Sequence, residues 1–160
     1  MREQRIGRIV QVSVNPRGGV PKHAVPGAEL TTEGVRGDKQ RDKRFHGGPT
    51  RAVSLYALER IEALRAEGHP IAPGSTGENL TVAGLDWGTV QAGDRLRVGE
   101  WVELQITGYA APCSNIEASF TEGVFKRISE KLHPGWGRLY ASVLVAGEVC
   151  AGDLVEHLPG

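Results

Sequence analysis

Short runs in which apolar and polar residues alternate recur along the 160-residue chain. Such alternation places one side-chain face in a core and the other in solvent, and it is typical of half-buried β-strands. Glycines and prolines fall between the runs as turn residues. The pattern predicts a mainly β, barrel-like fold with strands over residues 10–14, 79–82, 94–98, 101–106 and 138–145.

Two segments follow a helical period instead. Residues 54–68 begin at Ser54, a suitable N-cap, carry an apolar stripe and stop at Gly68. Residues 122–135 place apolar side chains four apart and end at Pro134. We expect a helix over each segment, so the barrel should carry a few short helices.

The motif V-x-A-G-D occurs twice, in residues 90–96 and 149–155. Glycine and aspartate favour tight turns. We interpret the two copies as one turn solution used twice, each leading into a strand, and not as a functional repeat.

The length and composition favour a single domain over residues 1–160. The start of the sequence is charged and does not resemble a signal peptide, and no long apolar run predicts a membrane helix. We therefore expect a cytoplasmic protein that does not contact a membrane. Thiols stay reduced in the cytoplasm, so Cys113 and Cys150 should both be free.

The formal net charge is zero, which argues against a nucleic-acid partner. The charge is nevertheless uneven along the chain. Residues 1–51 hold 11 Lys/Arg and 5 Asp/Glu, a net charge of +6, and residues 52–160 hold 8 and 14, a net charge of −6. The basic excess is concentrated in residues 36–51, where it suits a small anionic ligand.

Cys113 follows the predicted strand 101–106 in a loop that Pro112 opens. A free cysteine often serves as a small buried apolar residue. A thiolate in an accessible loop is instead a nucleophile or a ligand for a soft metal or a bound sulfur. Both interpretations stay open from the residues alone, as does a nucleophilic pair of Cys113 with His46.

Two further loops carry polar groups suited to a ligand. In residues 45–51, Gly47 and Gly48 allow backbone N–H groups to approach an anion, and Arg51 offers a forked donor. In residues 73–84, hydrogen-bonding side chains precede a strand: Thr76, Glu78 and Asn79. The alternatives are tight turns, with a structural His46 and with Glu78 or Asn79 capping backbone groups.

Several other chemistries have no support in the sequence. It contains neither the G-x-S-x-G motif of hydrolases nor a P-loop nor G-x-G-x-x-G. Its cysteines and histidines also lack the spacing of a zinc finger.

In combination, three segments resemble the MOSC family, the domain shared with the C-terminus of molybdenum cofactor sulfurases. They are H-G-G-x-x-R-A-V-S-L-Y from His46, G-E-N-L-x-V-x-G from Gly77, and P-C at Cys113. The resemblance covers roughly residues 5–156. It implies a β-barrel around a pocket for the molybdenum cofactor, or for sulfur destined for that cofactor.

The resemblance also assigns residues. Cys113 falls on the family's key cysteine, which carries a persulfide or ligates molybdenum, and Asn79 falls where relatives contact the cofactor near the metal. The basic segment would meet the anionic pterin phosphate and oxo groups. The implied cofactor-binding set is Arg36, His46, Gly47, Gly48, Arg51, Thr76, Glu78 and Asn79. We therefore predict that Arg51 and Cys113 line one cavity.

The function implied first is reduction of N-hydroxylated compounds as small-molecule substrates, with electrons from a separate redox partner. The alternative is a sulfur carrier that receives a Cys113 persulfide from a sulfur donor protein, and a third is a structural barrel that has lost its cofactor. No pyridoxal phosphate is expected, since the aminotransferase-like domain is absent from the sequence. Segments of longer relatives are also absent, so we expect either that part of the cofactor pocket is missing or that the second subunit of a homodimer supplies it.

Overall fold

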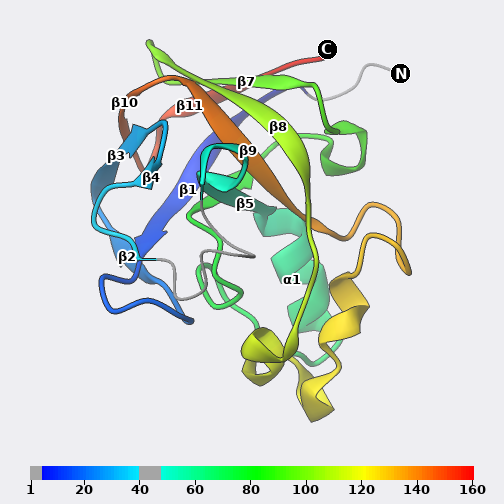
Figure 1. Ribbon diagram of the computed structural model, residues 1–160. Coiled ribbons are helices and arrows are strands. Elements are labelled where there is room, and N and C mark those ends of the chain that lie inside the picture. The colour runs from blue at the N-terminus through cyan, green and yellow to red at the C-terminus, as the bar shows by residue number, and fades with distance from the viewer. Residues whose placement is uncertain (1–4, 40–47) are drawn as a thin grey trace.

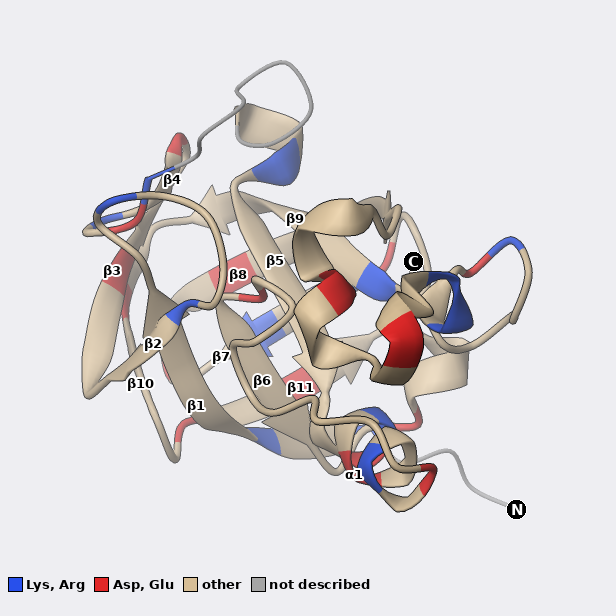
Figure 2. Ribbon diagram, turned by 90° about the horizontal axis from the view of Figure 1, so that it is seen from below, with Lys and Arg blue, Asp and Glu red and all other residues tan. Residues whose placement is uncertain are grey.

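A closed β-barrel forms the body of the protein in the computed structural model, which describes residues 5–39 and 48–160. Neighbouring strands follow the order β11, β7, β8, β9, β5, β6 and β1, and β1 pairs again with β11 to close the ring. Figure 2 looks into this ring, with the strands arranged around the interior. The predicted mainly β barrel is confirmed.

The barrel strands are β1 (Ile6–Val14), β5 (Val53–Ala57), β6 (Leu80–Ala83), β7 (Arg95–Val98), β8 (Val102–Ala110), β9 (Arg138–Val145) and β11 (Leu154–Leu158). Strand β2 (His23–Val25) pairs with the end of β1. A small second sheet has the order β10, β3, β4, with strands β10 (Gly147–Cys150), β3 (Gly27–Thr31) and β4 (Gly34–Val35). The sheet lies against one side of the barrel (Figure 1).

The barrel is filled by the inward residues of the alternating strands. Along β8, Val102, Leu104 and Ile106 are buried and the residues between them are only partly covered. The same alternation holds in β7, where Leu96 and Val98 are buried. Each predicted strand is therefore present, because period-two patterns report which face meets the core.

The predicted helix over residues 54–68 is wrong in its first part. Val53–Ala57 forms strand β5, which runs parallel to β6 and antiparallel to β9, and only Leu58–Ala66 forms the helix α1. All five residues of β5 are buried, so packing on both faces outweighs the helical pattern. Ser54 therefore caps no helix, and its hydroxyl instead donates to the Gly77 carbonyl at 3.0 Å.

The predicted helix over residues 122–135 is also wrong. The chain forms two short 3₁₀ turns here, η4 (Thr121–Gly123) and η5 (Phe125–Ile128). Glu122 and Gly123 have φ values of 58° and 67°, which an α-helix does not accept. Leu132, which would belong to the apolar stripe, is 57% exposed, so its spacing reflects no buried face.

The repeated V-x-A-G-D motif forms the same turn twice, as predicted. Gly93 and Gly152 have φ values of 94° and 95°, and the next residue, Asp94 or Asp153, accepts a backbone N–H from three residues earlier. These N···O distances are 3.0 Å to Asp94 and 2.8 Å to Asp153. Strands β7 and β11 follow directly.

Only the first copy of the V-x-A-G-D motif also contacts a buried histidine. Asp94 Oδ2 lies 2.7 Å from His157 Nε2, and its Oδ1 accepts the Gly160 N–H at 2.9 Å. Burial opposes ionisation of Asp94, but these hydrogen bonds, with that from Gln91, hold its pKa below the ordinary value. The charged form of Asp94 is therefore favoured by folding.

No helix in the described residues is long and apolar enough to cross a membrane. Cys113 and Cys150 are both free thiols, as the sequence predicts.

We predict that Asp94→Asn lowers the free energy of unfolding by about 1–3 kcal/mol at pH 7, because it disturbs buried polar partners. Asp153→Asn is the matched control, since it changes the same turn without a histidine. The folded-state pKa of Asp94 is lowered, so its contribution is present above the unfolded pKa of about 3.9 and is lost as the pH falls through the folded value.

Urea denaturation of both variants from pH 7 down to pH 3 measures this difference. Equal destabilisation by the two substitutions at pH 7 would show that the His157 contact adds nothing.

Candidate functional site

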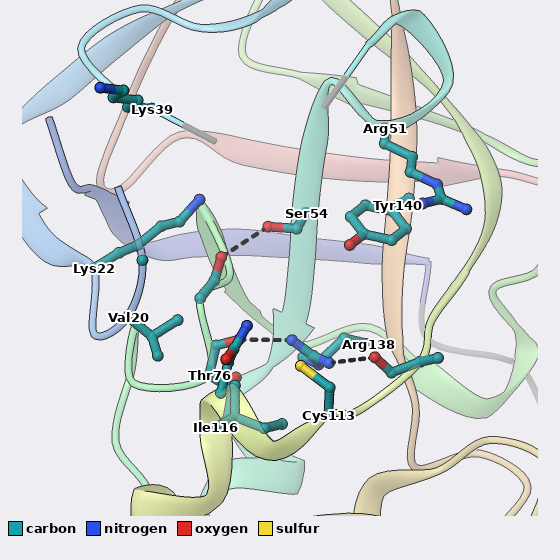
Figure 3. Close-up of a pocket in the computed structure, with 14 residues that line it drawn as sticks. Val20, Lys22, Lys39, Arg51, Ser54, Thr76, Cys113, Ile116, Arg138 and Tyr140 are labelled. Carbon is teal, nitrogen blue, oxygen red and sulfur yellow. Dashed lines mark hydrogen bonds between the residues drawn. The ribbon is translucent and has the colours of Figure 1, made fainter. Parts of the chain in front are cut away.

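A cavity of about 240 Å³ contains Cys113. Its walls come from the start of β5, the start of β9, the loop after β8 and three loops before β6. The lining residues are Gly19, Val20, Lys22, Lys39, Arg51, Ser54, Thr76, Gly77, Ala111, Cys113, Asn115, Ile116, Arg138 and Tyr140. Figure 3 shows that segments far apart in the sequence supply them.

The charged residues among those lining the cavity are all basic: Lys22, Lys39, Arg51 and Arg138. Lys22 is neutralised by Asp38, whose carboxylate lies 2.5 Å from the lysine Nζ. Among the lining residues that the structure describes, no acidic side chain accompanies the other three. An anionic ligand is therefore the class that this cavity favours.

Arg138, the first residue of β9, is the least expected member of the site. It is only 8% exposed, and its guanidinium donates to the carbonyls of Thr76 at 2.6 Å and Ala111 at 3.3 Å. Its Nε has no hydrogen-bond partner within the part of the chain that the structure describes. Burial lowers the pKa of Arg138, against the opposite effect of nearby groups that include Glu78 and Cys113.

Glu78 supports Arg138 through Thr76. The Thr76 carbonyl accepts from Arg138, and the Thr76 hydroxyl donates to Glu78 at 2.8 Å. Glu78 also accepts from the Gly74 N–H and the Thr81 hydroxyl, both at 3.0 Å. The fully buried carboxylate thus fixes the loop whose carbonyl holds the guanidinium.

Cys113 lies at the point where the chain leaves β8 and begins the 3₁₀ helix η3 (Ser114–Ser119). Pro112 precedes it, and the thiol is partly exposed in the cavity. In Figure 3 its sulfur points toward the Arg138 guanidinium. The loop position that the sequence predicts is confirmed.

Arg51 ends the 3₁₀ turn η1 (Pro49–Arg51) and reaches over the ring of Tyr140, with 5.4 Å from its Cζ to the ring centroid. Burial raises the pKa of Tyr140, against the lowering effect of Arg138 and Arg51, so its hydroxyl stays protonated at neutral pH. Arg51 and Cys113 line one cavity, which confirms the geometric prediction.

Asn79 and Glu78 do not line the cavity, although the sequence places them in the cofactor-binding set. The Asn79 side chain donates to Ser13 O at 3.1 Å and Asp38 at 2.9 Å, and its oxygen accepts from the Ser54 N–H at 3.1 Å. The protein itself thus uses their hydrogen-bonding groups. Glu78 and Asn79 therefore match the alternative interpretation, a structural turn in which they cap backbone groups. Of Thr76, Glu78 and Asn79, Thr76 alone is among the described lining residues.

Two other predicted residues, Arg36 and Gly48, are not among those that line the cavity. Arg36 is exposed, lies 3.5 Å from Glu29 and lines a separate surface hollow. Gly48 is exposed and precedes η1, with φ of 80°, but is not among the lining residues. His46 and Gly47 lie outside the described residues, and so does the pairing of His46 with Cys113.

Cys150 lies in the second sheet, at the end of β10 and away from the cavity. Its pKa is raised by desolvation and by the neighbouring carboxylates of Asp153 and Glu148. It is therefore a protonated thiol at neutral pH, unlike a nucleophile or metal ligand.

Sequence reasoning missed Arg138, Tyr140 and Ser54. Arg138 and Tyr140 are two apart in the predicted strand 138–145, on the face opposite its apolar residues Leu139, Ala141 and Val143, so the alternation of that strand gives no signal for a buried site.

We predict that Asn79→Ala lowers the free energy of unfolding by about 2–4 kcal/mol, because it removes the side-chain acceptor of the Ser54 N–H and one donor each to the Ser13 carbonyl and the Asp38 carboxylate. Asn115→Ala is the control, since Asn115 is exposed and lines the cavity. It should leave the urea midpoint unchanged. The same midpoint for both variants would argue against a structural role for Asn79.

Three known proteins show the relationship of this chain. It is 35% identical over 130 residues to the Bacillus subtilis "Uncharacterized protein YflK", which covers 81% of this chain and 58% of YflK. It is 31% identical over 157 residues to Escherichia coli "Protein YiiM", covering 94% of this chain and 68% of YiiM. It is 31% identical over 130 residues to a "Reductase" of Gibberella moniliformis, covering 78% of this chain and 22% of that protein.

The fold agrees with these matches. The crystal structure of YiiM from Escherichia coli has a TM-score of 0.69 with this chain, over all of it and 71% of YiiM, at 24% identity. By its sequence matches, this chain spans less than two thirds of the length of YflK and about a fifth of the length of the reductase. The family model of the MOSC domain matches residues 42–156, so this chain belongs to the MOSC domain family.

Proposed function

We propose that this protein binds a molybdenum cofactor in the Cys113 cavity and reduces N-hydroxylated compounds with electrons from a separate redox partner. Membership of the MOSC family supports the cofactor, and one relative carries the name reductase. The observation that carries the proposal is Arg138, a buried guanidinium with an open donor beside a single thiol.

The residues present fit such a group. No cluster of three or more His, Cys, Asp or Glu side chains within residues 5–39 and 48–160 is placed to hold a metal ion. A metal bound at Cys113 would therefore bring most of its ligands with it, as a metal held by a pterin does. The soft thiolate suits a thiophilic metal, and the basic lining suits an anionic cofactor.

The roles of the residues follow from their positions. Cys113 would supply the thiolate ligand, and Arg138, which lines the cavity, would donate a guanidinium N–H to an anionic or oxo group. Arg51 and Lys39, both exposed, would meet the phosphate. The Tyr140 hydroxyl, protonated at neutral pH, would donate a hydrogen bond to the substrate. The bound cofactor would supply oxygen transfer and the change of metal oxidation state.

A sulfur carrier is the second candidate function, and the size of the cavity favours it. At about 240 Å³ the cavity is smaller than the roughly 300–1,000 Å³ of typical ligand sites. A persulfide on Cys113 needs only an accessible thiolate near positive charge, whereas a cofactor needs a larger enclosing surface. A second subunit in a homodimer would provide that surface.

We predict that protein made in cells able to synthesise the cofactor contains molybdenum and pterin, and that Cys113→Ser loses most of the metal, because a hydroxyl is a poor ligand for a soft metal. Cys150→Ser is the matched control and should retain the metal. Metal analysis and intact mass measure both. Metal-free protein with reducible sulfur on Cys113 would favour the carrier, and protein with neither would favour a barrel that has lost its cofactor.

We predict that Arg51→Glu weakens retention of the anionic ligand about tenfold or more, since it reverses the charge at an exposed rim position. Arg65→Glu, which makes the same change on an exposed face of α1, should not. Both variants should melt close to the wild type. Metal content after gel filtration measures retention, and equal loss from the two variants would point to net charge and not to the site.

A further inference from the structure

The cavity contains a built position for an oxyanion next to its thiol. Arg138 is only 8% exposed. Two of its nitrogens donate to backbone carbonyls, and its Nε has no hydrogen-bond partner among the described residues. Leaving a buried charged donor unsatisfied is costly. Nε itself is buried, but the two carbonyls engage only two of the five guanidinium N–H groups, so N–H groups on the other two nitrogens remain for a ligand in the cavity that Arg138 lines.

The ligand that fits this position is small and negatively charged. All charged residues of the lining are basic, and the cavity volume of about 240 Å³ suits a tetrahedral oxyanion together with the thiol it faces. In Figure 3 the sulfur of Cys113 points toward the guanidinium. An anion held by Arg138 would therefore lie within reach of the sulfur.

The second cysteine does not share this position. Cys150 lies in β10, outside the cavity, with a raised pKa. A sulfur atom placed on Cys113 is therefore not displaced by disulfide formation with Cys150 in the same cavity. The site can take up sulfur and hold it.

We propose that this cavity is a sulfurtransferase site for thiosulfate, from which Cys113 takes the outer sulfur and releases sulfite. The proposal rests on the second candidate function, the sulfur carrier, and names its donor as a small inorganic anion. Arg138 binds the sulfonate end of thiosulfate and directs the outer sulfur to Cys113.

The chemistry balances without another reactant. The Cys113 thiolate attacks the outer sulfur of thiosulfate and forms a new S–S bond, while the S–S bond of thiosulfate breaks. The electron pair of the broken bond leaves with the sulfite. The cysteine sulfur is oxidised to the persulfide level as the sulfonate sulfur is reduced to sulfite. Two anions must meet in this step, and the guanidinium reduces their repulsion.

The test uses the Cys150→Ser protein, in which any added sulfur must be on Cys113. After incubation with thiosulfate without reductant, we expect a mass gain of one sulfur atom, removed by dithiothreitol, and an equal amount of sulfite. Cys113→Ser in the same background should give neither. Absence of both sulfur and sulfite from the Cys150→Ser protein would overturn the proposal.

Arg138→Met should slow loading by about tenfold to a hundredfold, the effect expected for losing a charge-assisted hydrogen bond, and Arg138→Lys should lose less. Circular dichroism and thermal melting check that both variants fold. Sulfate, which binds the same way but carries no transferable sulfur, should slow loading of the parent protein. Loading at the parent rate in either folded variant, or in excess sulfate, would overturn the role of Arg138.

The experiments distinguish failure of the thiosulfate proposal from failure of the cofactor proposal. Protein that retains molybdenum yet forms no persulfide from thiosulfate overturns this inference alone. Protein from cofactor-producing cells that loads sulfur and holds no molybdenum supports this inference and overturns the cofactor proposal.

Discussion

The site depends on keeping one buried guanidinium charged at the wall of the cavity. Removing a cation from water costs several kcal/mol unless hydrogen bonds and nearby negative charge compensate. Arg138 donates hydrogen bonds to two carbonyls, one of them that of Thr76. The Glu78 carboxylate accepts from three donors, including the Thr76 hydroxyl, and its negative charge stabilises the guanidinium. The two carbonyls engage two of the five guanidinium N–H groups, so donors remain on the side that lines the cavity. A carboxylate in direct contact with Arg138 would neutralise it and close the site to anions.

A rigid wall makes this balance possible. Asn79 and Asp38 bind each other and tie the loop before β6 to β1, β5 and Lys22. Because these partners are up to 66 residues apart in the sequence, the wall exists only when the barrel has closed. The cation and the thiol therefore become neighbours as a result of folding, and a disturbed wall changes the chemistry without touching either group.

The sequence predicted those parts of the molecule that local pattern controls. Strands with one buried face were predictable from their alternating apolar and polar residues. The two Gly-Asp turns were predictable because their φ values require glycine. Strand β5 is buried on both faces, so its apolar and polar residues do not alternate, and its sequence predicts a helix instead. Arg138 was missed because its meaning depends on Thr76 and Ala111, which only the fold brings near. Glu78 and Asn79 lie in the predicted loop but do not line the cavity, and the sequence does not show which side of a loop its side chains face.

Closure of the barrel also determines how the molecule meets other chains through its backbone. Pairing of β1 with β11 leaves the ring without a free strand edge. In the described residues the exposed edges fall on β2, of three residues, on β4, of two, and on the outer side of β10, of four. Edges this short offer few backbone groups for an added strand. Association through β-sheet extension is therefore disfavoured, and partners must recognise side chains.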